Sequence, residues 1–236
     1  MMKQERAPTS NGKLSGKVVI VTGGTQGLGE SIAHHLAELS ASGLVICGRN
    51  QERGQLVAHA LNQSGCPSLY IAADLAIEED CRRVVLACDE RFGRVNGLVN
   101  AAGITTRGTL EDTTVSLWDN MFAVNARAPF ILMQEAVGVM KRQHIGGSIV
   151  NIASISSLIA QPAFVPYNTS KGALLQLTRC LALDLAPHNI RVNCVCPGSV
   201  HTPATERHIQ FEKADRDEFL RAASEASFLK RLGTPR

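Results

Sequence analysis

A serine, a tyrosine and a lysine in this chain have the spacing of an acid–base site. Tyr167 precedes Lys171 by four positions, and Ser154 precedes Tyr167 by thirteen. Residues at i and i+4 share one face of an α-helix, about 6 Å apart along its axis, so the ammonium of Lys171 is expected beside the phenol of Tyr167. A phenol titrates near pH ~10, and a neighbouring cation lowers its pKa. The pattern therefore predicts that Tyr167 shuttles a proton near neutral pH.

Ser154 must reach this helix from another element. The run SIVNIAS (148–154) is typical of a buried strand, with the serine at its carboxyl end, facing the helix of Tyr167. A Tyr-x-x-x-Lys match is weak by itself, because both residues often stand at helical spacing on a surface. The elements around it must support the catalytic interpretation.

Short β-branched runs alternate with longer helical patterns along the chain. This rhythm predicts a Rossmann-type α/β fold with a parallel sheet covered on both faces, in the doubly wound order 3-2-1-4-5-6. The predicted strands are 17–23, 43–49, 68–74, 97–103, 148–154 and 190–198. The predicted helices lie near 27–40, 51–64, 78–92, 115–143 and 164–186.

Polar residues and glycines gather where these strands end. In such a sheet, ligands bind in the crevice at the carboxyl ends of the strands. Ser154, Asn100, Gly103 and the segment 197–202 all stand at those ends. Their agreement strengthens the prediction of a site around Tyr167.

A glycine-rich loop, TGGTQGLG (22–29), follows the first strand and opens a helix. Glycines permit a tight turn and a close approach of the backbone to a pyrophosphate, and the helix N-terminus offers free N–H groups. The spacing is one residue wider than the usual dinucleotide fingerprint. The predicted cofactor-binding residues in this loop are Gly23, Thr25, Gln26, Gly27, Leu28 and Gly29.

Residues at the end of the second predicted strand would contact the ribose of a dinucleotide, so their chemistry indicates which cofactor is preferred. A carboxylate there would bind a free 2′-hydroxyl, but this chain has Cys47-Gly48-Arg49-Asn50. We therefore predict a preference for NADP(H), with Arg49 on the 2′-phosphate and NAD(H) as a possible second cofactor. The alternative for Arg49 is a solvated loop residue. Asp74 and Leu75 are predicted at the adenine, and Asp74 could instead be the N-cap of the following turn.

Size and composition favour one catalytic domain over 14–236, preceded by a flexible tail over 1–13. The chain of 236 residues is 44% hydrophobic and 19% charged, and its net charge of +3 is too small to indicate a nucleic-acid partner. No apolar run has the length of a membrane span, so we expect a soluble, cytoplasmic protein. The seven cysteines predict reduced core residues without disulfides or a metal site, Cys194 and Cys196 included.

Together these residues resemble the classical short-chain dehydrogenase/reductase family over roughly 14–234. TGGTQGLG is similar to its glycine motif, Asp74 to its adenine-binding aspartate, and Asn100-Ala101-Ala102-Gly103 to its N-N-A-G segment. Asn125 is similar to the asparagine on its long helix. Ser154, Tyr167 and Lys171 match its catalytic residues. The segment Pro197-Gly198-Ser199-Val200-His201-Thr202 resembles the P-G-x-x-x-T segment at the nicotinamide.

The resemblance implies transfer of a hydride and a proton between a carbonyl and a secondary alcohol. Tyr167 would be the acid or base, and Ser154 would stabilise the substrate oxygen. Tyr167 and Lys171 would also bind the cofactor, with Lys171 at the nicotinamide ribose. Asn125 would order a water that links the lysine to solvent; its alternative is a structural polar group that kinks the helix. The cofactor residues implied after the fourth and sixth strands are Asn100, Ala101, Gly103, Pro197, Gly198, Val200 and Thr202.

Two departures from the family pattern bear on assembly and activity. Ala101 replaces the second asparagine of N-N-A-G, and the sequence ends at Arg236, where relatives continue into a helix and a last strand. We then expect the sixth strand to be an open edge of the sheet. The expected assembly is a homodimer or a homotetramer. This ending also keeps an alternative open, a catalytically silent subunit or sensor that binds the cofactor.

The resemblance implies that the segment near 199–225 forms a lid over the substrate. Its sequence pattern predicts an amphipathic helix carrying Phe211, Phe219 and Leu220. Further apolar wall is expected from Ile104, Ile155, Ala163 and Phe164. These residues favour a moderately hydrophobic substrate. A 3-oxoacyl thioester, a polyol and a small cyclic ketone are all compatible with them.

Overall fold

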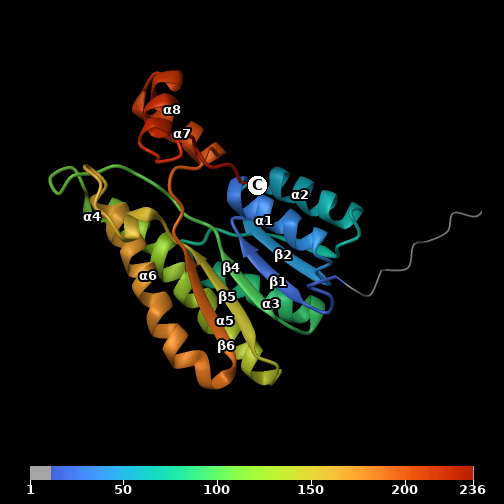
Figure 1. The fold of residues 1–236 in the computed structure, drawn as a ribbon. Coiled ribbons are helices and arrows are strands. Elements are labelled where there is room, and N and C mark those ends of the chain that lie inside the picture. Colours follow the sequence, from blue (N-terminus) through green and yellow to red (C-terminus); the bar gives the residue numbers. More distant parts are fainter. Residues whose placement is uncertain (1–11, 236) are drawn as a thin grey trace, which may run out of the picture.

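The computed structural model of the protein describes residues 12–235, so the predicted tail lies almost wholly outside the described part (Figure 1). Six parallel strands form one sheet in the order β3-β2-β1-β4-β5-β6, which confirms the predicted Rossmann-type topology. The strands are β1 (Val18–Thr22), β2 (Gly43–Gly48), β3 (Ser68–Ala72), β4 (Gly97–Asn100), β5 (Gly147–Ile152) and β6 (Ile190–Val195).

The helices that connect these strands lie close to the predicted ranges. They are α1 (Gly27–Glu38), α2 (Gln51–Gln63), α3 (Glu78–Phe92), α4 (Val115–Phe122), α5 (Ala128–Arg142) and α6 (Val165–Leu185). Short 3₁₀ turns follow β5 at Ile155–Ser157 and α6 at Ala186–His188. None of the described helices is long and apolar enough to cross a membrane.

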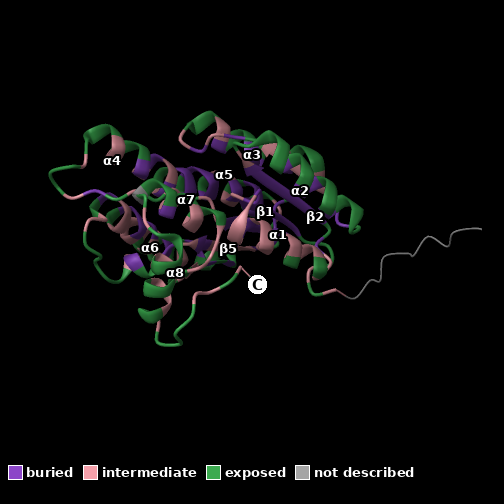
Figure 2. Ribbon diagram, turned by 90° about the horizontal axis from the view of Figure 1, so that it is seen from above, coloured by how far each residue is buried: buried purple, intermediate pink, exposed green. Residues whose placement is uncertain are grey.

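Apolar side chains fill both faces of the sheet because each central strand lies between two layers of helices. In β1, Val18 and Ile20 pack into the core formed with α3 and α5, while Val19 and Val21 pack with α1 and α2. All five residues of β1 are buried. Figure 2 shows β1 and β2 buried between exposed outer helix faces. This two-sided burial explains why the central strands β1 and β2 are apolar on both faces.

The predicted helix over 115–143 is interrupted by a π-helical turn, Ala123–Arg127, between α4 and α5. Asn125 lies in this turn and is fully buried. Its amide bonds to the main chain of Ile104, outside the helix, which gives the π-turn a local cause. Such turns are frequent at functional sites.

The segment after β6 forms two helices, α7 (Pro203–Glu212) and α8 (Arg216–Glu225), so the prediction of a single amphipathic helix is wrong in this respect. Lys213 has a left-handed φ of 51° and ends α7. Asp215 begins α8 by accepting a 2.8 Å hydrogen bond from the main-chain N–H of Glu218. Figure 1 shows both helices above one end of the sheet, beyond β6.

The residues that follow α8 return to the start of this segment. The main-chain N–H of Gly233 donates to the oxygen of Ser199, and its oxygen accepts from the N–H of His201, both at 2.9 Å. Further along, Ser31 of α1 donates a 2.6 Å hydrogen bond to the main-chain oxygen of Pro235. Within residues 12–235, no strand pairs with the outer edge of β6, where Val195 is 48% exposed.

Candidate active site

Lys171 lies on α6 and is buried, with 4% of its surface exposed. Its ammonium nitrogen donates a 2.9 Å hydrogen bond to the main-chain oxygen of Ile152 and lies 5.9 Å from the centre of the Tyr167 ring. Burial lowers the pKa of Lys171 from 10.5 to about 8, since it penalises the charged form. The predicted proximity of Tyr167 and Lys171 on one helix face is therefore present.

Tyr167 stands in the first turn of α6, which begins at Val165 with a proline at the next position. The Tyr167 ring is half-buried, and it meets the ring of Phe164 edge-on at 6.1 Å between centroids. Ser170 Oγ donates to the main-chain oxygen of Tyr167 at 2.8 Å. These contacts fix the start of the helix that carries the phenol.

Ser154 is buried just beyond the end of β5. Its hydroxyl oxygen accepts a 3.1 Å hydrogen bond from the main-chain N–H of Ser156, so the hydroxyl hydrogen remains available to another acceptor. The next residue, Ile155, donates its N–H to the main-chain oxygen of Pro197 at 2.9 Å. The parallel pairing of β5 with β6 thus brings the serine segment beside the Pro-Gly segment.

Asn125 makes two reciprocal hydrogen bonds with Ile104: its Oδ1 accepts from the N–H, and its Nδ2 donates to the oxygen, both at 2.9 Å. Nδ2 also donates to Ser170 Oγ at 3.0 Å. Asn125 therefore ties the loop after β4 to the helix that carries Tyr167 and Lys171. Both amide hydrogens of Asn125 are engaged in these contacts.

A pocket of about 500 Å³ lies at the carboxyl ends of β1, β2 and β4, where the strand order reverses. Predicted residues that line it are Gly23, Thr25, Gln26, Gly27, Leu28, Gly29, Arg49, Asp74, Leu75, Ala101, Gly103 and Thr202. Residues in its lining that the sequence did not single out as ligands are Gly48, Asn50, Arg53, Ala73, Ala102, Ile104, Val124, Pro203, Ala204 and Arg207.

Gly103 connects this pocket to the predicted acid–base residues. A Cβ at Gly103 would lie 3.3 Å from the ammonium nitrogen of Lys171 and 3.4 Å from Asn125 Oδ1. Because Gly103 also lines the pocket, Lys171 lies directly behind the pocket wall. The structure therefore places a nucleotide-sized pocket beside the predicted proton shuttle.

The glycine loop has the close approaches that a dinucleotide cradle needs. Gly23 has a left-handed φ of 66°, and a Cβ there would lie 2.8 Å from the Cα of Ala102. A Cβ at Gly29 would lie 2.3 Å from the main-chain oxygen of Gly23. Thr22 Oγ1 accepts from the main-chain N–H groups of Ala101 and Ala102, both at 3.1 Å, which holds the ends of β1 and β4 together. The residues present thus fit a dinucleotide.

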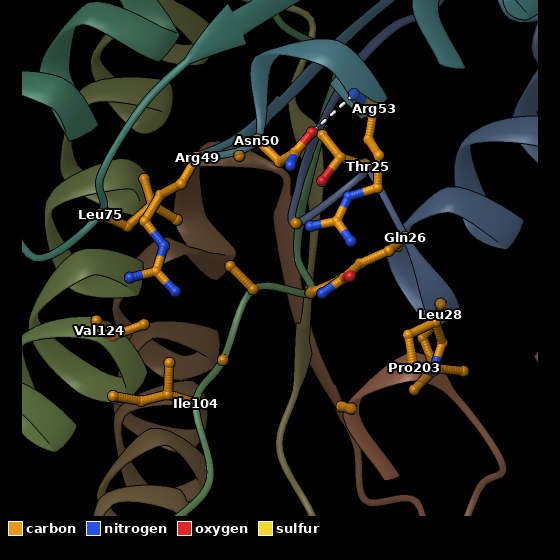
Figure 3. A pocket seen from close by; sticks show the side chains of 18 of the residues that line it. Thr25, Gln26, Leu28, Arg49, Asn50, Arg53, Leu75, Ile104, Val124 and Pro203 are labelled. Atoms are coloured by element: carbon orange, nitrogen blue, oxygen red, sulfur yellow. Dashed lines mark hydrogen bonds between the residues drawn. The ribbon is translucent and has the colours of Figure 1, made fainter. Parts of the chain in front are cut away.

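Two arginines follow β2: Arg49 lies between the strand and the N-cap of α2, and Arg53 lies in the first turn of that helix. Asn50 caps this helix by accepting a 2.8 Å hydrogen bond from the main-chain N–H of Arg53. Figure 3 shows the guanidinium of Arg53 extending toward Gln26, while that of Arg49 extends toward Leu75. The signal that could have found the second arginine is its place in the first helical turn after the predicted strand end, next to the predicted 2′-phosphate position.

Asp74 lies two residues beyond the end of β3, in a turn. Its Oδ1 accepts a 3.0 Å hydrogen bond from the main-chain N–H of Ala76, which is the capping contact predicted as its alternative role. Its own N–H donates to Asp80 Oδ2 at 2.7 Å. Asp74 and Leu75 both line the pocket, so the capping contact and a place beside the nucleotide occur together.

Six predicted cofactor residues are not in the pocket lining: Tyr167 and Lys171 on α6, and Asn100, Pro197, Gly198 and Val200. Asn100 is buried beneath it, where its Nδ2 donates to Asn151 Oδ1 at 2.8 Å and its own Oδ1 has no partner. Val200 forms an isolated β-bridge with Gly233. The Pro-Gly segment lies instead next to Ser154, through the contact of Pro197 with Ile155.

Comparison with known proteins gives the family. The family model described as short chain dehydrogenase matches residues 17–213. An uncharacterised oxidoreductase of Thermotoga maritima is 37% identical over 218 residues, covering 92% of this chain and 85% of its own length. A cyclopentanol dehydrogenase of Comamonas sp. is 33% identical over 205 residues, covering 87% of this chain and 81% of its own.

A solved structure agrees with these sequence matches. It is the crystal structure of a protein from Sinorhizobium meliloti 1021 that carries a provisional short-chain alcohol dehydrogenase name. It superimposes with a TM-score of 0.86 at 33% identity, covering 94% of this chain and 85% of the other. With this sheet order, this strand-end pocket and these matches, the chain belongs to the short-chain dehydrogenase/reductase family of NAD(P)(H)-using oxidoreductases.

Proposed function

We propose that the protein is an NADP(H)-dependent oxidoreductase that interconverts a carbonyl and a secondary alcohol. The observation that carries this proposal is the position of Gly103, which lines the nucleotide pocket and lies against Lys171. That contact supports a position of the nicotinamide at the end of the pocket next to the helix of Tyr167. A protein that merely bound a dinucleotide would have no chemical need for Ser154, Tyr167 and Lys171 there.

Bound NADPH would supply the hydride to the carbonyl carbon. Tyr167 would donate its phenolic proton to the carbonyl oxygen, which becomes the alcohol, and would take the proton back in the reverse direction. The free hydroxyl hydrogen of Ser154 would bond to the same oxygen and stabilise its developing charge. Lys171 would hold the nicotinamide ribose hydroxyls and return a proton to Tyr167.

Asn125 acts in this proposal as a positioning residue. Its amide holds Ile104, and with it the backbone next to Gly103, against α6. The Oδ1 of Asn125 retains one acceptor site after it binds the N–H of Ile104. The water that would link Lys171 to solvent stays a prediction.

The preference for NADP(H) rests on charge at the end of β2. Arg49 and Arg53 line the pocket there, beside the capped N-terminus of α2, and the first carboxylate after the strand is that of Glu52, outside the lining. Two guanidiniums and a helix N-terminus would bind a 2′-phosphate. A free 2′-hydroxyl would leave this charge without a partner.

For the substrate we propose a small, moderately hydrophobic ketone or its alcohol. Phe164 lies between Tyr167 and the lid, at 5.8 Å between its ring centroid and that of His208. Ile104 is half-buried in the pocket wall, and Ile155, next to Ser154, is 39% exposed. The relative named as a cyclopentanol dehydrogenase supports a cyclic substrate among the predicted classes. The homodimer or homotetramer stays a prediction.

Binding titrations with NADPH and NADH, followed by a panel of ketones and alcohols with the tighter cofactor, test this function. We expect tighter binding of NADPH, turnover of cyclic ketones, and a loss of turnover of at least about 10³-fold in Tyr167→Phe with unchanged cofactor affinity. Equal or tighter binding of NADH would contradict the role of Arg49. Binding of NADPH without turnover by any substrate would favour the silent subunit instead.

A further inference from the structure

Arg207 of α7 reaches the nucleotide pocket from the lid. Thr202, Pro203, Ala204 and Arg207 line the pocket from one side, at the start of this helix. The Nη1 of Arg207 donates a 3.1 Å hydrogen bond to Oε1 of Gln26, in the glycine loop. These two residues are 181 positions apart in the sequence. The contact therefore joins the lid directly to the cradle of the nucleotide.

Three guanidiniums converge on this pocket, from Arg49, Arg53 and Arg207. Within residues 12–235, the structure shows no ion pair between any of them and an acid. Partial desolvation, and then the charges of Arg53 and Arg49, lower the pKa of Arg207. Asp74 is the one carboxylate in the described lining, and it caps its own turn. The cluster therefore carries excess positive charge that an anion would compensate.

We propose that Arg207 binds a phosphate group of the cofactor and thereby fastens α7 over the bound nucleotide. This inference rests on the proposed function, because it needs a dinucleotide in the pocket. Gln26 lies beside the N-terminus of α1, where a pyrophosphate would lie, while Arg49 and Arg53 stand where a 2′-phosphate would lie. Both groups offer anionic oxygens to a guanidinium, and the test separates them.

His208, the residue next to Arg207, connects α7 to the aromatic side chains near the candidate active site. His208 lies 5.8 Å from the ring of Phe164 and 5.8 Å from that of Phe219 on α8. Glu206 accepts two hydrogen bonds from Arg216, at 2.9 and 3.1 Å, which tie α7 to α8. A phosphate held by Arg207 would thus fix both lid helices beside Phe164 and Tyr167. The expected kinetic order is cofactor first and substrate second.

Arg207→Gln tests the contact, with Arg221→Gln as the matched control, because Arg221 is an exposed arginine on α8 outside the pocket. Dissociation constants for NADPH and NADH are measured by fluorescence titration for the wild type and both variants. We expect Arg207→Gln to weaken binding by about tenfold or more, the scale of one charge-assisted hydrogen bond, and Arg221→Gln to bind as the wild type does.

The pattern of the loss identifies the phosphate. A loss for NADPH alone assigns Arg207 to the 2′-phosphate, and an equal loss for both cofactors assigns it to the pyrophosphate. Unchanged affinity for both cofactors would overturn the inference. The proposed function fails separately, if the wild type binds neither cofactor; a wild type that prefers NADH contradicts only the NADP(H) preference, and Arg207 is then judged on NADH.

Limited trypsin digestion tests the fastening of the lid. Lys213 is an exposed residue between α7 and α8, so cleavage after it reports on the lid. We expect saturating NADPH to slow this cleavage several-fold in the wild type and in Arg221→Gln, but not in Arg207→Gln at equal saturation. Equal protection of all three proteins would show that α7 is held without Arg207.

Discussion

The ammonium nitrogen of Lys171 donates a 2.9 Å hydrogen bond to the main-chain oxygen of Ile152, the last residue of β5. This bond joins α6 to the strand that leads, two residues later, to Ser154. The position of the serine relative to the tyrosine is therefore fixed by the lysine that stands between strand and helix. A substitution of Lys171 would loosen the geometry of the site as well as remove a charge.

The first prediction concerns the stability of the protein without cofactor as pH changes. Burial lowers the pKa of Lys171 from 10.5 to about 8, so the folded state loses this proton at a lower pH than the unfolded chain. Below pH 8 both states hold the proton and the burial cost is fully present. Between about pH 8 and pH 10.5 the unfolded state binds more protons, so stability relative to a variant without the lysine rises with pH.

Urea unfolding of the wild type and Lys171→Met measures this change. We expect the free energy of unfolding of the wild type to rise relative to the variant by roughly 3 kcal/mol between pH 7 and pH 10.5. Lys141→Met, at an exposed position near the end of α5, should show almost no such change. A difference between wild type and Lys171→Met that stays constant with pH would contradict the burial of a charged lysine.

Two glycines with different surroundings should respond oppositely to alanine. A Cβ at Gly29 would lie 2.3 Å from the main-chain oxygen of Gly23, so Gly29→Ala must move the loop away from α1. A Cβ at Gly138, inside α5, meets nothing within 4 Å. We expect Gly29→Ala to cost about 1–3 kcal/mol and weaken NADPH binding, and Gly138→Ala to gain about 0.5–1 kcal/mol. Thermal unfolding and cofactor titration check both; a stabilised Gly29→Ala would refute the close approach.

Asn125→Ala should destabilise the fold and slow turnover together. The substitution leaves the buried N–H and oxygen of Ile104 without their partners, at an expected cost of roughly 2–3 kcal/mol. Turnover should fall because the backbone beside Gly103 is released from Lys171. Asn120→Ala, at an exposed position on α4, should change stability by less than about 0.5 kcal/mol. Full stability in Asn125→Ala, measured by chemical unfolding, would argue that the amide is not structural.

The thiols should react in the order of their exposure. Burial raises the pKa of Cys47 and Cys88 to about 12 and that of Cys81 to about 11, while Cys180 is exposed. We expect a disulfide reagent to modify Cys180 within seconds to minutes and the three buried thiols only after unfolding. Peptide mapping after timed labelling gives the order. Early labelling of Cys47 would mean that β2 opens in the native protein.

The sheet order was predictable because strands such as β1 and β2 are continuously apolar and alternate with helices, and this alternation is typical of a doubly wound parallel sheet. The proximity of Tyr167 and Lys171 followed from helical spacing. Arg207 was not predictable, since its contact with Gln26 depends on how the lid folds back over α1. The break between α7 and α8 depends on Lys213 and on the cap at Asp215, and an aspartate in a sequence can begin a helix or a turn.

Asn100 shows another limit of prediction from a sequence motif. Its place as the last residue of β4 indicates the correct end of the sheet, but its side chain bonds to Asn151 and is not in the pocket lining. The direction of a side chain at a strand end depends on contacts with the neighbouring strand. A sequence motif therefore does not predict that direction. The same holds for the Pro-Gly segment, which the register of β5 and β6 brings to Ser154.

The bridge between Gly233 and the Ser199–His201 segment fixes both ends of the lid side by side. The intervening residues leave and rejoin the body of the protein at almost one point. A segment with adjacent ends can be lengthened, shortened or exchanged at little entropic cost to the rest of the chain. If this segment determines the substrate range as proposed, an exchange of residues 208–232 should change that range, provided that the pocket-lining residues Thr202 to Arg207, the sheet and the predicted proton-transfer residues are kept.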